Sequence, residues 1–166
     1  MRTRTLAIVA FGTSVMLAIG AVFAMAGSPT AVEAELTGFK EVPAISTTGN
    51  GSFDAEIRAH AIHYRLQYDD LEGGDVLFAH IHLGRTATNG GVVAFLCGGD
   101  STPACPQSGT VEGTITADDV ENLAVQGIEA GEFRELVRAI RRNATYVNVH
   151  TEAFPGGEVR GNVIGS

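Results

Sequence analysis

The sequence predicts one small, mainly β domain with antiparallel strands. Apolar and polar residues alternate with a period of two in several short segments, the pattern of strands with one buried face. Glycine, asparagine and proline separate these segments at short intervals, as in antiparallel β proteins. Roughly 130 residues follow a hydrophobic N-terminal stretch, which is enough chain for one core.

The N-terminal stretch indicates export. Two arginines precede an uncharged segment that runs from Leu6 to Ala26. A basic start followed by an apolar stretch is typical of a secretory signal, so we predict a signal peptide over residues 1–26 and a linker over 27–33. Cleavage after Ala34 is an alternative, and an uncleaved membrane anchor is another, because the apolar run approaches the ~20 residues that span a bilayer. In each case the domain is expected to be secreted, periplasmic or on the cell surface.

The charge of the chain restricts its partners. The formal net charge is −8, and this value already includes the two N-terminal arginines. Nucleic acids require a basic surface, so they are not expected as partners. We expect an extracellular or periplasmic protein or ligand, and a membrane only if the N-terminal segment is retained.

Two cysteines lie close together in the sequence. Cys97 and Cys105 flank a loop rich in glycine, serine and proline. In an exported protein such a pair predicts a disulfide. Two thiolate metal ligands are the alternative, but neither cysteine belongs to a CxxC motif.

The strands are predicted in the following order. The first covers residues 34–38 and ends before Pro43, because proline lacks the backbone donor of a ladder. Two clearly alternating segments follow with a short connection, so they are expected to form a hairpin. The further strands are bounded by glycine, asparagine or proline. The predicted segments after the first are 51–58, 61–68, 76–83, 91–96 and 109–115.

One or two short helices are predicted before the last two strands. Thr116 can cap a helix start, and the aspartates that follow suit its positive end. Residues 131–142 show an apolar stripe at helical spacing, which we interpret as a docking face, and an arginine edge, which we interpret as a solvated face. The stripe is Phe133, Leu136, Val137 and Ile140, and the edge is Arg134, Arg138, Arg141 and Arg142. Strands at 145–151 and 158–164 complete the chain.

Three histidines could hold a metal ion. His80 and His82 are two residues apart in a strand, so both project from one face. His150 shares a strand face with Tyr146 and Asn148. If the two strands are neighbours, three imidazoles converge, an arrangement that suits zinc or copper. The alternative is that these histidines are structural and bonded to loops or carboxylates.

Other polar residues are predicted to be structural. His60 and His63 are expected at the surface. Glu158 is expected to pair with Arg160 or with a nearby backbone amide. No catalytic residue is assigned, because the sequence has no G-x-S-x-G, no phosphate-binding glycine loop and no CxxC.

Several motifs resemble the CHRD domain, which occurs in the extracellular antagonist chordin and singly in many exported bacterial proteins. The resemblance covers residues 34–166. The segments that carry it are Leu36-Thr37-Gly38, Glu41-Val42-Pro43, Ala79-His80-Ile81-His82, Tyr146-Val147-Asn148-Val149-His150-Thr151 and Phe154-Pro155-Gly156-Gly157-Glu158-Val159-Arg160-Gly161.

The resemblance implies an immunoglobulin-like or Greek-key antiparallel β-barrel or sandwich related to Cu/Zn superoxide dismutase. His80-Ile81-His82 is similar to the copper motif of that enzyme, and His150 is similar to a later copper ligand. No counterpart is found of its bridging histidine, or of its zinc-binding histidine and aspartate.

The sequence therefore supports two functions. The first is an exported, non-enzymatic CHRD-domain protein with a structural, surface or ligand-binding role. The second is a copper- or zinc-binding protein that uses His80, His82 and His150, with superoxide chemistry as its least favoured form.

Overall fold

A computed structural model describes residues 30–165, which form a mainly β fold with one antiparallel sheet of nine strands. The signal peptide predicted over residues 1–26 lies outside the described residues. The strands are β1 Ala31–Thr37, β2 Asn50–Ile57, β3 Ile62–Asp69, β4 Val76–Leu83, β5 Gly91–Cys97, β6 Gly109–Ile115, β7 Thr145–Thr151, β8 Val159–Asn162 and β9 Ile164–Gly165.

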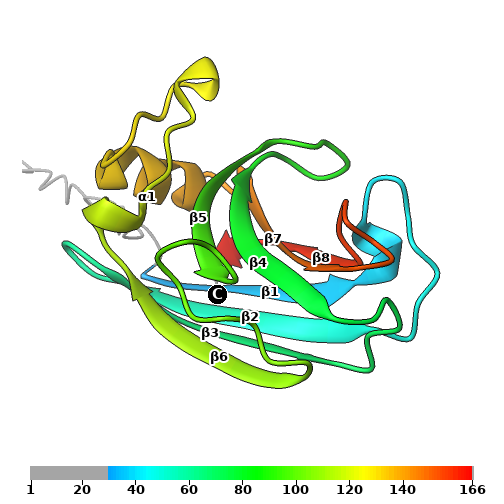
Figure 1. Cartoon of the computed structure of the whole chain (residues 1–166). Helices are drawn as coiled ribbons and strands as arrows, with labels where there is room; N and C mark the ends of the chain where they lie inside the picture. Colours follow the sequence, from blue (N-terminus) through cyan, green and yellow to red (C-terminus); the bar gives the residue numbers. More distant parts are fainter. Residues whose placement is uncertain (1–29, 166) are drawn as a thin grey trace, which may run out of the picture.

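The sheet curls into a nearly closed barrel. Its strand order is β5-β4-β7-β8-β1-β2-β3-β6, and β9 pairs with β1 beside this path. The two end strands, β5 and β6, contact each other, so the sheet has two walls (Figure 1). One wall contains β4, β5, β7 and β8, and the other contains β1, β2, β3 and β6. The predicted barrel or sandwich class is confirmed.

Alternating side chains fill the space between the walls. In β3 the residues Ile62, Tyr64, Leu66 and Tyr68 are buried, and they alternate with exposed residues. Tyr64 also points inward, and its hydroxyl donates a hydrogen bond of 2.7 Å to the carbonyl of Leu96 in the opposite wall. A buried tyrosine needs such a partner for its hydroxyl. The period-two pattern thus defines the core face of the strands.

The first strand begins earlier than the sequence predicted. β1 starts at Ala31, so residues 31–33 belong to the sheet and not to a linker. Val32 is 2% exposed and alternates with the buried Ala34 and Leu36. It lies opposite Ala55 of β2, which extends the ladder to the beginning of the described chain.

The segment between β6 and β7 contains the predicted helices. Helix α1 spans Phe133–Arg141, and its four apolar stripe residues are buried while its arginines are exposed. The predicted start at Thr116 is a 3-10 turn, Ala117–Asp119, closed by a capping box between Thr116 and Asp119. Two further 3-10 turns are Gly38–Lys40 and Ala124–Gln126. Within residues 30–165, no helix has the length and apolar character needed to cross a membrane.

A disulfide joins Cys97 to Cys105, as predicted. It connects the end of β5 to the loop that leads into β6. Because these strands end the sheet order, the bridge fixes the connection across the nearly closed side of the barrel.

Candidate metal centre

Neighbouring strands bring the three predicted histidines together. β4 pairs antiparallel with β7, and the register places His80 opposite Asn148 and Phe78 opposite His150. His80 and His82 alternate with the core residues Ala79 and Ile81, so they project from the other face of this wall. There the three imidazoles are nevertheless buried, with 5%, 8% and 6% exposure for His80, His82 and His150.

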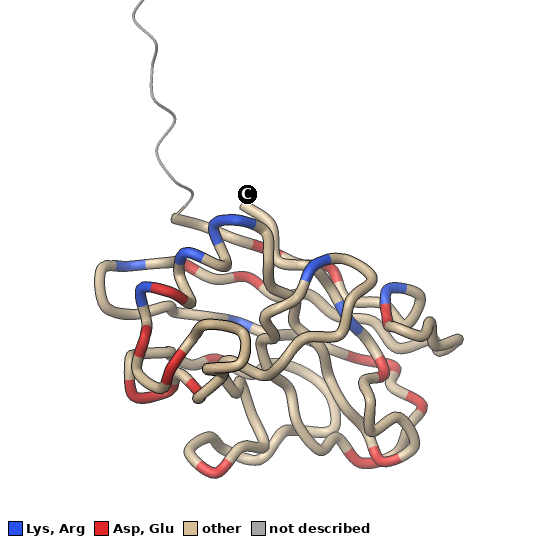
Figure 2. Tube along the Cα trace, turned by 90° about the horizontal axis from the view of Figure 1, so that it is seen from above, with Lys and Arg blue, Asp and Glu red and all other residues tan. Residues whose placement is uncertain are grey.

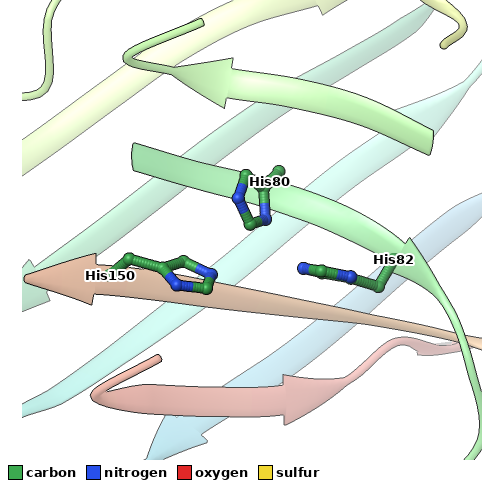
Figure 3. A group of neighbouring side chains, drawn as sticks. All are labelled: His80, His82 and His150. Atoms are coloured by element: carbon green, nitrogen blue, oxygen red, sulfur yellow. The ribbon is translucent and has the colours of Figure 1, made fainter. Parts of the chain in front are cut away.

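The three rings point toward one another (Figure 3). The ring centroid of His80 lies 4.6 Å from that of His82 and 4.4 Å from that of His150. One nitrogen from each ring lies within 4.8 Å of the others. Nitrogens that share one ion at bonds of about 2 Å lie up to about 4 Å apart, so this spacing is close to that of a metal site.

Backbone carbonyls orient two of the rings. The Nδ1 of His82 lies 2.8 Å from the carbonyl of Gly90, and the Nδ1 of His150 lies 2.9 Å from the carbonyl of Pro155. A carbonyl can only accept, so each Nδ1 carries the proton and each Nε2 keeps a lone pair. Metal-binding histidines commonly use their second nitrogen in this way.

One nitrogen of each ring has no partner. Within residues 30–165, the Nε2 of His82, the Nε2 of His150 and the Nδ1 of His80 are buried and form no hydrogen bond. Buried polar atoms are normally satisfied, because the loss of water otherwise costs free energy. Three such atoms in one cluster are the strongest indication of a bound group, and imidazole nitrogens suit a transition metal.

Burial keeps the three imidazoles neutral. Burial, together with the charges that His150 and His82 would carry, lowers the pKa of His80 to about 2. Burial also lowers the pKa of His82 to about 4, against the opposing effect of the Gly90 carbonyl. The pKa of His150 is lowered for the same reason. Neutral imidazole is the form that binds metals.

An aromatic and cationic stack supports His82. The Tyr146 ring is parallel to the His82 ring, with 4.5 Å between centroids and 3° between planes. On the Tyr146 ring, the guanidinium carbon of Arg160 lies 3.4 Å from the centroid. A cation over an aromatic face is attracted by its quadrupole, and this attraction is stronger when the pair is desolvated.

Arg160 also holds the loop that orients His82. This fully buried side chain donates to the carbonyls of Arg85 and Thr88, at 3.1 and 2.7 Å, and to the Oδ1 of Asn89 at 3.2 Å. The next residue is Gly90, whose carbonyl accepts a hydrogen bond from the Nδ1 of His82. Arg160 therefore holds this loop through three hydrogen bonds, and the loop in turn orients His82.

Glu158 does not pair with Arg160, although the sequence allowed this pairing. Its buried carboxylate accepts hydrogen bonds from the amides of Glu72 and Gly73, at 2.6 and 3.0 Å. The hydroxyls of Thr47 and Thr151 donate two more, both at 2.7 Å. The other expectation, a pairing with backbone amides, is therefore the one that the structure bears out.

Sequence reasoning missed Glu41, a buried carboxyl near Asn148 and Arg160. It is 6% exposed, and its Oε1 has no hydrogen-bond partner among the described residues. Burial raises the pKa of Glu41 to about 7, and the charge of Arg160 opposes this rise. Gly157, at φ +118°, lies so close that a Cβ there would collide with Glu41 and Asn148. The sequence offered one indication of Glu41: it is a single acidic residue before Val42-Pro43, in one of the segments that resemble the CHRD domain.

The other histidines lie outside the cluster. His60 and His63 are exposed, as predicted, and His63 contacts the hydroxyl of Thr114 at 3.0 Å. In the part of the chain that the structure describes, His80, His82 and His150 form the only group of three or more histidine, cysteine or acidic side chains close enough to share an ion.

Comparison with known proteins identifies the domain. The family model of the CHRD domain matches residues 32–163, which is almost the whole described chain. No curated protein and no solved structure matches the chain. The matched range includes all three histidines, the disulfide and β1 from its second residue. The chain belongs to the CHRD domain family.

Proposed function

We propose that this chain is an exported, non-enzymatic CHRD-domain protein that binds one copper ion through His80, His82 and His150. The observation that carries this proposal is a cluster of three buried imidazoles that offer nitrogens within 4.8 Å of one another, each ring having one buried nitrogen without a partner. A purely structural histidine layer would be expected to satisfy these nitrogens with carbonyls, hydroxyls or carboxylates.

The donor set favours a transition metal over calcium or magnesium. Imidazole nitrogens suit copper and zinc, whereas the alkaline-earth ions prefer oxygen ligands. Two of the three rings already have fixed tautomers, so little ordering is needed on binding.

Charge favours copper over zinc at this position. Three neutral imidazoles contribute no negative charge, and Arg160 adds a positive charge behind Tyr146. Burial of a doubly charged ion is costly when no anionic ligand compensates it. Copper can bind as the singly charged cuprous ion, so we expect cuprous copper to bind more tightly than zinc.

Export is supported by two features. The disulfide Cys97–Cys105 is typical of oxidising compartments. The first residues have the pattern of a secretory signal. Cleavage after Ala34 would remove four residues of β1, including the buried Val32, whereas cleavage after Ala26 leaves the strand intact. We therefore propose Gly27 as the first residue of the mature chain.

A titration tests the proposed site. Chain 27–166, purified without chelator, is titrated with cuprous copper under reducing conditions that preserve the disulfide, and separately with zinc. We expect one copper ion per chain for the wild type and loss of binding in the variant His80→Ala/His82→Ala. Circular dichroism of each protein verifies that it is folded.

The matched control is His60→Ala/His63→Ala, which removes two exposed histidines. This control should bind copper as the wild type does. Equal loss in both variants, or no binding by the folded wild type, would overturn the proposal.

A further inference from the structure

A groove on the acidic domain is lined by arginines. It lies between helix α1 and the β2–β3 turn, and five of its lining residues are arginines. They are Arg58, Arg134, Arg138, Arg141 and Arg142, and all five are exposed. Residues 30–165 contain nine basic and nineteen acidic residues, so more than half of the positive charge is at this one place.

Three of these arginines have no acidic partner. Arg58 pairs with Glu56 at 2.8 Å, and Arg138 pairs with Glu135. Within residues 30–165, no ion pair involves Arg134, Arg141 or Arg142. Their charges are therefore available to an external anion.

Apolar side chains also line the groove, among them Ile57, Phe133 and Val137. Glu135 is the one acid in the lining, and it pairs with Arg138. Arginines beside apolar side chains fit an amphiphilic anion better than a fully hydrated one, because the apolar side chains offer no polar partner.

The groove lies beside the N-terminal end of the described chain. Thr30, the first described residue, lines it. Figure 2 shows the basic positions mostly in the half of the molecule where the described chain begins, whereas the acidic positions are spread over both halves.

We infer that this arginine groove docks the domain on an anionic membrane surface by binding phospholipid phosphates. Basic side chains next to a membrane are attracted to anionic headgroups. The net negative charge of the domain opposes non-specific attraction, so any such binding must come from the groove. This inference is independent of the metal site.

Vesicle co-sedimentation tests the groove. Chain 27–166, which retains every strand and the helix, is mixed with vesicles of phosphatidylcholine alone or with added phosphatidylglycerol. We expect binding only to the anionic vesicles, and its reversal by salt. The variant Arg134→Gln/Arg141→Gln/Arg142→Gln should lower the partition coefficient by about tenfold or more.

The matched control is Lys40→Gln/Arg65→Gln/Arg85→Gln. It also removes three exposed basic side chains, but none of them lines the groove. Retention of binding by this control supports a local site. An equal loss in both variants, or no binding of the folded wild type to anionic vesicles, would overturn the inference.

Discussion

Arg160 joins two parts of the candidate metal site. Its guanidinium packs on Tyr146, which itself packs on His82. The same guanidinium donates to three acceptors in residues 85–89, next to the Gly90 carbonyl that accepts from His82. Arg160 therefore positions the His82 ring from both sides.

We predict that Arg160→Met lowers copper affinity by about 10–100-fold, the usual cost of losing an outer-shell contact to a metal ligand. Methionine keeps much of the buried volume but none of the donors. Calorimetric titration of chain 27–166 measures the affinity. Arg160→Lys should restore little, because a lysine ammonium cannot reach three acceptors in a planar fork. Full affinity in the folded Arg160→Met protein would contradict the positioning role.

The buried histidines predict acid sensitivity. In the unfolded chain each titrates near 6.5, but burial lowers the pKa of His82 to about 4 and that of His80 to about 2. As pH falls below 6.5, the unfolded chain binds protons that the folded chain does not, so the free energy of unfolding falls. Glu41 opposes this effect, because its raised pKa of about 7 lets the folded chain hold an extra proton above 4.5.

Urea unfolding of the metal-free chain at about pH 7 and about pH 5 measures these contributions. We expect the wild type to be less stable at the lower pH, since three histidines outweigh one carboxyl. Glu41→Gln should steepen this loss, and His80→Ala/His82→Ala should reduce it. The explanation fails if the folded histidine variant loses as much stability as the wild type does.

At the scale of elements, Glu158 connects segments that are distant in the sequence. It accepts from the 47–49 loop, from the 72–73 turn and from Thr151 of β7. Burial alone would raise the pKa of Glu158, but the amide of Glu72, the hydroxyls of Thr47 and Thr151 and the amide of Gly73 together lower it. The ionised carboxylate therefore stabilises the fold above its ordinary pKa.

We predict that Glu158→Gln lowers the free energy of unfolding by about 2–4 kcal/mol near neutral pH, because a charged acceptor of several hydrogen bonds is lost. Urea unfolding measures this difference, which should shrink as pH falls below about 4.5 and the wild-type carboxylate becomes protonated. Glu112→Gln is the control, since Glu112 forms only an exposed ion pair and should change stability by less than about 1 kcal/mol. Equal effects of the two substitutions would contradict this stabilising role of Glu158.

Local patterns predicted most elements well. The strands at 76–83, 109–115 and 145–151 coincide with the observed bounds, because each is delimited by turn residues. The start of β1 was missed, since Glu33 and the preceding polar residues resemble a linker. The sequence also suggested a single last strand, whereas Val163 lies between β8 and β9.

The site depended on information that local patterns lack. A period of two shows that His80 and His82 share a face, but the pairing of β4 with β7 joins segments about 65 residues apart. The sequence alone predicted that the three imidazoles converge only if these two strands are neighbours. The contacts of Arg160 with residues 85–89 depend on a loop conformation that no periodicity encodes.

At the scale of the molecule, the boundary of the domain has a direct consequence. A chain that starts at Glu35 lacks four residues of β1, including Val32 and Ala34, which are 2% and 4% exposed. These residues pair with β2, and Val32 also pairs with β9. Their loss opens one end of the ladder and exposes the core beneath it.

We predict that chain 35–166 is less stable than chain 27–166 by at least about 3 kcal/mol, from lost apolar burial and strand pairing. Thermal unfolding followed by circular dichroism measures the difference. A chain that starts at Thr30 is the control and should match chain 27–166. Equal melting temperatures for chains 35–166 and 27–166 would show that the N-terminal half of β1 is dispensable.

The proposed copper site consists of three specific ring nitrogens that bind one metal ion. The most direct test is ¹⁵N NMR of the histidine rings before and after cuprous copper, which is diamagnetic, is added to chain 27–166. We predict that the signals of His82 Nε2, His150 Nε2 and His80 Nδ1 shift, while the Nδ1 protons of His82 and His150 remain. Unchanged ring nitrogens, or loss of those Nδ1 protons, would contradict the proposed copper site.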